Sequence, residues 1–118
     1  MFYVEYYETA DGRVPVREFL SMLPPKIREK SIFTLNVLRE FGNTLREPYS
    51  KYLGDGIFEL RIKYSSNAIR IFYFFYVGQK IVITHGFVKK TMKTPGAEKR
   101  KAIKYRQDYF NRRRDNYV

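Results

Sequence analysis

Cationic side chains recur at strand spacing in the middle of this sequence, within a region that is otherwise mostly apolar or aromatic. A guanidinium can bind two oxygens of one phosphate and stays charged in proteins. A lysine or histidine can also give or take a proton when its surroundings move its pKa toward neutrality. Phosphate binding and proton transfer are therefore the chemistry that these residue types could support. The side chains concerned are Arg61, Lys63, Arg70, His85 and Lys89.

Two neighbouring strands are expected to carry the arginines. Apolar and polar residues alternate over residues 58–64, which is the period of a strand with one buried and one polar face. Residues 69–77 form an almost unbroken apolar and aromatic run, typical of a central strand, and Arg70 is its exception. The parity of the loop around residues 65–67 decides which face of the sheet Arg61 occupies. We expect an even number of loop residues, because that register buries the apolar side chains of the first strand together and places Arg61 beside Arg70.

A second hairpin is predicted at Gly78, because glycine readily adopts the positive φ of a tight turn. With Gly78 and the next residue as a two-residue turn, Val77 lies opposite Lys80, and Phe87 lies opposite Arg70. One face of the sheet then carries the five cationic side chains together with Phe72, Phe74, Tyr76 and Phe87. The other face is expected to be the aliphatic one, and from this hairpin it receives Ile71, Tyr73, Phe75, Val82, Thr84 and Val88.

The remaining segments predict one further strand and three helices. Alternation over residues 2–7 suits a first strand, and a short helix is expected to begin at Pro15. A second helix is predicted over residues 25–41, and a third from a cap at Thr94 to about Arg112. The predicted order is β-α-α-β-β-β-α, which describes an α+β fold with a small antiparallel-rich sheet and helices on one face.

Length and charge limit the functional classes. A chain of 118 residues has room for one compact core, so we expect a single domain over residues 1–118. The net charge is +11, and residues 86–118 carry eleven Lys or Arg against three Asp or Glu. Such an asymmetry favours a phosphate-backbone partner, although a solvated basic helix or a surface for an acidic protein explains it equally well.

The sequence also argues against several other classes. It contains no cysteine and one histidine, so disulfides are impossible and no ligand set for a metal ion is recognisable. It has neither a Gly-rich phosphate loop nor a nucleophile–His–acid arrangement. The N-terminus does not read as a signal peptide, and no apolar stretch approaches the length of a membrane span. We therefore expect a cytoplasmic protein that does not enter the membrane.

Four motifs in a fixed order carry a resemblance to a known family. They are the segments 51–61 (KYLGDGIFELR), 69–73 (IRIFY) and 85–91 (HGFVKKT), followed by Thr94-Pro95. Together they resemble the RelE/ParE superfamily of type II toxins, and more narrowly its phage-derived HigB-like branch. The resemblance covers nearly the whole chain, because the predicted helices also fall where that family has them.

The resemblance implies a function and a set of partners. Toxins of this kind are ribosome-dependent mRNA endonucleases (mRNA interferases) that block translation, and the resemblance implies neither a metal nor any other cofactor. The implied partners are the ribosome, its mRNA and a cognate antitoxin, often a small helix-turn-helix repressor. Carried over by position, the resemblance assigns Arg61, Arg70 and Lys90 to the basic active face, with Lys89 beside them.

Metal-free RNA cleavage suggests a role for each group. Arg61 and Arg70 would stabilise the charge of the phosphorane-like transition state. Deprotonation of the ribose 2′-hydroxyl and protonation of the 5′ leaving oxygen need titratable groups, for which the candidates are His85, Glu59, Lys89, Lys90, Tyr105 and Tyr109. The predicted catalytic residues are Arg61, Arg70, Lys90 and His85, and the predicted RNA-binding residues are Lys63, Lys89, Lys93, Phe72 and Phe87.

One departure and several alternatives stay open. RelE has two lysines on the strand where this chain has Ile57 and Glu59, so the general base is not fixed. Glu59 could instead pair with Arg61 or Lys63, His85 could be a packed residue, and the aromatic side chains could belong to the core or to an antitoxin groove. The functional alternatives are a ParE-type toxin that inhibits DNA gyrase without cleaving RNA and an inactive phage-derived binding protein.

Overall fold

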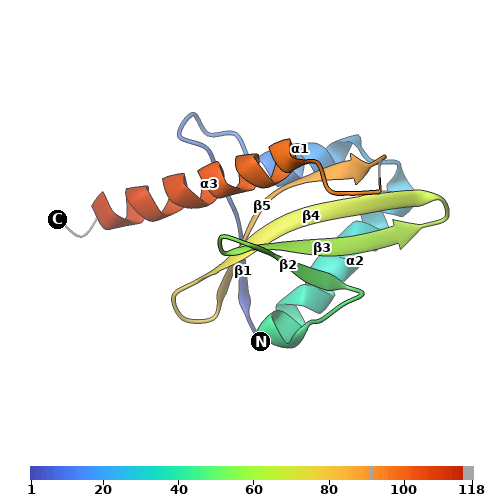
Figure 1. Ribbon diagram of the computed structural model, residues 1–118, viewed down its shortest axis with the longest axis horizontal. Coiled ribbons are helices and arrows are strands. Elements are labelled where there is room, and N and C mark those ends of the chain that lie inside the picture. Colours follow the sequence, from blue (N-terminus) through green and yellow to red (C-terminus); the bar gives the residue numbers. More distant parts are fainter. Residues whose placement is uncertain (91, 116–118) are drawn as a thin grey trace.

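A five-stranded sheet forms the centre of the computed structural model, which describes residues 1–90 and 92–115 (Figure 1). The strand order is β1-β5-β4-β3-β2, with β1 parallel to β5 and every other neighbouring pair antiparallel. The predicted α+β class with an antiparallel-rich sheet is confirmed. The strands are β1 (Tyr3–Tyr6), β2 (Ser50–Gly54), β3 (Ile57–Tyr64), β4 (Asn67–Tyr76) and β5 (Lys80–Lys89).

The helices lie on both faces of this sheet (Figure 1). Helices α1 (Pro15–Met22) and α2 (Pro25–Phe41) pack on the aliphatic face, and a short 3-10 helix η1 (Gly42–Thr44) follows α2. Helix α3 (Gly96–Asp115) packs on the opposite face, where Ala102 and Tyr109 are buried with side chains of β4 and β5. The prediction that all helices share one face is therefore wrong. The apolar run of β4 explains the difference, because a central strand with large apolar residues on both sides needs cover on both sides. No helix in the described part of the chain is long and apolar enough to cross a membrane.

Strand β2 is missing from the predicted order. It forms a hairpin with β3, and the register pairs Gly54 with Ile57 across the two-residue turn Asp55-Gly56. Both turn residues have positive φ, 55° at Asp55 and 80° at Gly56, as in the turns that join tightly twisted strands. The Asp-Gly dipeptide is the sequence signal that could have identified this hairpin.

The β3–β4 hairpin has the predicted register. Tyr64 pairs with Asn67, which leaves a two-residue loop, and Arg61 therefore lies directly opposite Arg70. An even loop keeps the alternating apolar side chains of β3 on the face covered by α2, so both arginines occupy the other face.

The β4–β5 hairpin differs from the prediction at its turn. Tyr76 pairs with Lys80, so the loop has three residues and not two, and the expected pairing of Val77 with Lys80 is wrong. The register shifts back between Ile71 and Tyr73 of β4, where β5 supplies an extra residue, so the predicted pairing of Arg70 with Phe87 is confirmed. The three-residue loop also changes the face of Val82. Its side chain was expected on the aliphatic face but is buried with side chains of α3 on the opposite face.

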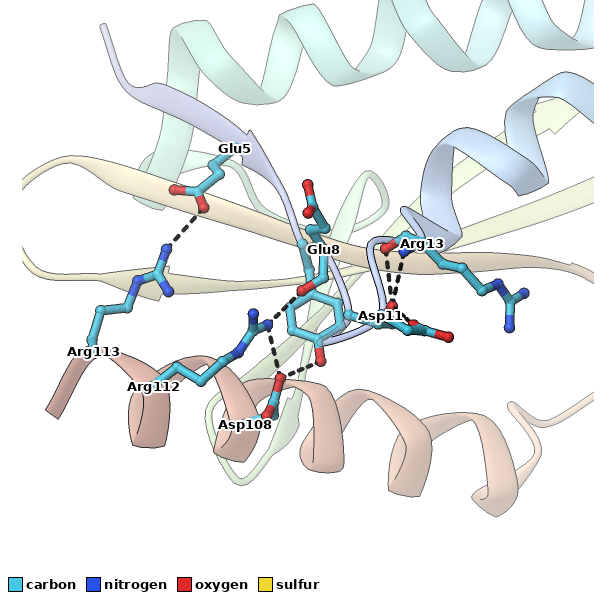
Figure 2. Close-up of polar contacts among 9 residues, drawn as sticks. Glu5, Glu8, Asp11, Arg13, Asp108, Arg112 and Arg113 are labelled. Atoms are coloured by element: carbon cyan, nitrogen blue, oxygen red, sulfur yellow. Dashed lines mark hydrogen bonds and ion pairs between the residues drawn. The ribbon is translucent and has the colours of Figure 1, made fainter. Parts of the chain in front are cut away.

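The C-terminal half of α3 is held against the N-terminal segment by polar contacts (Figure 2). Asp108 accepts a hydrogen bond from the Tyr7 hydroxyl at 2.6 Å and pairs with Arg112 at 2.8 Å. Arg113 pairs with Glu5 at 3.2 Å. These contacts use both arginines and explain why the helix continues to Asp115, beyond the predicted end near Arg112.

Candidate functional site

The two arginines share a buried carboxylate. Glu59 precedes Arg61 by two residues on β3, so its side chain emerges on the same face of the sheet. Arg61 Nε lies 3.4 Å from Glu59 Oε2, and Arg70 Nε lies 3.3 Å from Glu59 Oε1. The exposed fractions of the side chains are 26% for Arg61, 13% for Arg70 and 1% for Glu59. The structure thus brings both guanidinium groups together on one face and leaves each of them partly exposed.

Glu59 has the environment of a positioning residue. Besides the two guanidinium groups, it accepts a hydrogen bond from the Thr94 hydroxyl, which ties the segment before α3 to the sheet. Both carboxylate oxygens are therefore engaged, and the buried group has no open approach for a substrate. The alternative in which Glu59 pairs with Arg61 is the one that the structure contains.

Two lysines complete a cationic cluster around this carboxylate. Lys89 pairs with Ala68 at the end of β5, and burial together with the positive charges of Arg70, Arg61 and Lys51 lowers the pKa of its ammonium group, against the opposing effect of Glu59. Lys51 pairs with Glu59 across β2 and β3 and so lies on the same face. Lys51 was not among the predicted site residues, because β2 itself was not predicted. The cluster consists of Lys51, Arg61, Arg70 and Lys89 around Glu59.

The other predicted cationic residues lie farther along the same end of the molecule. Lys63 is exposed on β3, two residues beyond Arg61, while Lys90 and Lys93 are exposed just after β5. Their roles stay predictions. Among residues 1–90 and 92–115, no group of three or more His, Cys, Asp or Glu could hold a metal ion.

His85 lies inside the interface between β5 and α3. Only 4% of the residue is exposed, and its ring meets those of Phe72 and Tyr105 edge-on, at centroid distances of 5.1 and 5.7 Å. His85 Nε2 lies 3.1 Å from a Glu98 carboxylate oxygen and Nδ1 lies 3.2 Å from the Thr84 hydroxyl. A neutral ring that donates from Nε2 to Glu98 has its acceptor at Nδ1, where the Thr84 hydroxyl lies between Nδ1 and the Phe72 carbonyl oxygen, its other contact at 3.3 Å. Burial is the main reason why the pKa of His85 is lowered to about 4. His85 thus has the surroundings of a packed, hydrogen-bonded histidine.

The aromatic candidates divide by burial. Phe72 is fully buried beneath α3, so no face of its ring is open to an RNA base, and its predicted stacking role is corrected. Phe87 is only partly buried and pairs with Arg70, which leaves its predicted role standing. Tyr105 stacks on Tyr7 at 4.6 Å, and burial raises the pKa of Tyr109, so neither tyrosine is placed to accept a proton from RNA.

The buried histidine predicts a specific dependence of stability on pH. An unfolded histidine has a pKa near 6.5, whereas His85 in the folded protein keeps its neutral form down to about 4. The unfolded state therefore takes up a proton first as the pH falls, and the free energy of unfolding should drop by about 2 kcal/mol between pH 7 and pH 5 from this residue alone. In His85→Gln, the decrease in the free energy of unfolding between pH 7 and pH 5 should be smaller than in the parent protein by this amount. Urea unfolding of both proteins at the two pH values measures it. Identical pH dependence in the two proteins would contradict a neutral, buried His85.

The shared carboxylate predicts a large loss of stability on substitution. Glu59→Gln removes the negative charge between two guanidinium groups, and breaking such a buried pair costs roughly 3–5 kcal/mol. Glu47 is a matched control, because it pairs with the same Arg61 at 3.6 Å but its side chain is 65% exposed. Glu47→Gln should change the free energy of unfolding by less than about 0.5 kcal/mol. Urea unfolding of both variants measures these changes. Equal losses of unfolding free energy in Glu59→Gln and Glu47→Gln would contradict the role of Glu59 as a positioning residue.

Comparison with known proteins places the chain in a family. Residues 18–107, well over half of the sequence, match the family described as phage-derived protein Gp49-like (DUF891). A comparison with curated proteins gave no match. The matched segment contains α2, the four consecutive strands β2 to β5 and most of α3, and it includes every residue of the cationic cluster. The chain belongs to the phage-derived Gp49-like family.

Proposed function

We propose that this protein is the toxin of a type II toxin–antitoxin system and cleaves mRNA on the ribosome, in the manner of RelE- and HigB-like toxins. Membership of a phage-derived family and the resemblance of the strand motifs support this proposal. The observation that carries it is the direct pairing of Arg61 with Arg70 on the face beside the start of α3. Two adjacent, partly exposed guanidinium groups suit a phosphate that bridges them.

The proposed reaction needs no group beyond side chains of the chain itself. The 2′-oxygen of a ribose attacks the adjacent phosphorus while the bond to the 5′-oxygen breaks, which leaves a 2′,3′-cyclic phosphate and a 5′-hydroxyl. Arg61 and Arg70 stabilise the added negative charge of the transition state. Lys89, whose lowered pKa increases its neutral fraction, takes the 2′-hydroxyl proton, and the Lys90 ammonium gives a proton to the leaving oxygen.

The partners follow from the same proposal. The exposed basic side chains of α3, such as Arg100, Lys101 and Lys104, are suited to phosphates of ribosomal RNA beside the site. A cognate antitoxin, of the small helix-turn-helix kind, would neutralise the toxin.

Controlled expression without an antitoxin tests the proposal. Induction should stop growth and protein synthesis within one generation, and co-expression of a cognate antitoxin should restore both. Normal growth with intact transcripts would contradict the proposal. Growth arrest with DNA damage and uncut transcripts would instead favour inhibition of DNA gyrase.

A further inference from the structure

A hollow of about 640 Å³ lies at the edge of the sheet next to the arginine pair. Strand β2 covers only the first half of β3: its register partners end at Leu60, and the next contact is the Arg61 amide, which donates to the Tyr49 carbonyl at 2.8 Å. Beyond that point the edge of β3 borders the hollow, which α2 and the segment before β2 enclose. Arg61 and Arg70 both line it, so the hollow and the cationic cluster are continuous.

The walls of the hollow are mainly apolar and its border is cationic. Phe33 and Val37 of α2 line it together with Tyr49, while Lys30 and Lys63 stand among the cationic lining residues. Phe33 is 64% exposed and Tyr49 is 59% exposed, so these aromatic rings present open surface. Neither residue belongs to the two core clusters, and packing of the core therefore does not account for them.

This combination matches a nucleotide better than a peptide. A nucleotide offers a flat π-surface and a phosphate a few ångströms apart, and single-stranded RNA is recognised by stacking its splayed bases on aromatic or guanidinium groups. Carboxylates of an acidic peptide would meet the cations, but a carboxylate offers no ring to stack on the aromatic walls, whereas a nucleotide supplies both groups.

We propose that the hollow is a base-binding subsite, which receives a nucleobase of single-stranded RNA next to the phosphate held by Arg61 and Arg70. The inference rests on the proposed function, because that function sets the position of the phosphate. It adds a contact on the α2 side of the sheet, away from α3, and it gives a role to the exposed rings of Phe33 and Tyr49.

Binding of two matched oligonucleotides tests the subsite. One is a short single-stranded RNA with 2′-O-methyl groups, which cannot be cleaved, and the other has the same backbone with abasic positions. Fluorescence anisotropy at low salt should show the base-bearing strand bound about 5- to 100-fold more tightly, as stacking of one base predicts. Phe33→Ala and Tyr49→Ala should each remove most of this difference and leave abasic binding unchanged.

The control is Phe41→Ala. Phe41 ends the same helix and is 54% exposed, but it does not line the hollow, so its variant should bind both strands like the parent protein. Equal binding of the two strands, or equal loss in Phe41→Ala and Phe33→Ala, would overturn the subsite. A poly-glutamate peptide that competes with the base-bearing strand and loses affinity in Phe33→Ala would reassign the hollow to an acidic protein.

The same binding assay, extended to Arg61→Ala and Arg70→Ala, separates this inference from the proposed function. Abasic binding that still depends on Arg61 and Arg70 would leave the phosphate site in place even if the bases added nothing. Binding of both strands that is indifferent to Arg61→Ala and Arg70→Ala would instead remove the phosphate site itself.

Discussion

Replacing Arg61 and Arg70 together by alanine should abolish mRNA cleavage. Each guanidinium is proposed to stabilise the charge that develops on the phosphate, and loss of one such donor costs about 10²- to 10³-fold in rate. Because both groups face the same phosphate, the double variant should lose at least as much as the worse single variant. Purified protein added to translating ribosomes, with primer extension to measure cleavage, gives these rates directly.

Controls for this prediction separate chemistry from folding. Each single alanine variant leaves the buried Glu59 with one cation fewer, and Arg61 is the cleaner position because its side chain is 26% exposed, against 13% for Arg70. Arg17→Ala, at an exposed arginine of α1, should keep the parent rate. Arg61→Lys should recover only part of the activity, because an ammonium cannot form the two parallel hydrogen bonds of a guanidinium. Cleavage at the parent rate in a folded Arg61→Ala, Arg70→Ala protein would refute the assignment.

Replacing Lys89 by glutamine should lower the cleavage rate by about 10²- to 10⁴-fold, the usual contribution of a positioned proton-transfer group. Lys89 acts as a base only when neutral, so the rate of the parent protein should rise with pH until the lowered pKa of Lys89 is passed. The Lys89→Gln protein should lack this rise. The measurement is a pH–rate profile on translating ribosomes.

A comparison with Lys90 decides between neighbouring lysines. If the Lys90 ammonium supplies the proton to the leaving oxygen, Lys90→Gln should lower the cleavage rate and keep the rise of the rate with pH that Lys89 causes. Lys26→Gln, at an exposed lysine of α2, should leave the profile unchanged. A Lys89→Gln protein with the parent profile would show that another group takes the 2′-hydroxyl proton.

Much of the arrangement of β3 and β4 follows from local sequence. The alternation over residues 58–64 predicts which side chains of β3 lie on the face covered by α2, and burial of that set selects an even loop and the pairing of Arg61 with Arg70. The bounds of α2 agree with the prediction because Pro25 starts the helix and Gly42 follows it, with a positive φ of 50°.

Other features depend on contacts that no local pattern encodes. The three-residue turn after Tyr76 leaves no periodic signal, so the prediction places Val82 on the wrong face. The extra residue of β5 opposite Phe72 restores the predicted register only beyond Val82. Alternation placed His85 on the polar face, but only the packing of α3 on that face makes it a buried residue. Helices on one face would cover the aliphatic side alone, whereas the aromatic side chains of β4 form a second apolar face that α3 covers.

The site shows the same division. Register alone predicts that the two guanidinium groups meet, whereas the burial of Glu59 between them depends on Thr94, 35 residues away along the chain. The Asp55-Gly56 turn predicts the β2–β3 hairpin, but counting from that turn places Tyr52 opposite Glu59. Only the register shift between Tyr52 and Gly54 brings Lys51 to that position. The lowered pKa of Lys89 arises from the sum of burial and three cations on different strands, which composition does not reveal.

The chemistry of transcript ends tests the account most directly. After induction of the parent protein and of the Arg61→Ala, Arg70→Ala protein, 5′-ends of cellular mRNA are mapped with selection for 5′-hydroxyl groups. The account predicts new 5′-hydroxyl ends within coding regions, spaced in register with codons because the ribosome presents the mRNA in three-nucleotide steps, and no such ends in the arginine variant. Arrested cells whose transcripts stay intact, or cuts that persist unchanged in the arginine variant, would contradict it.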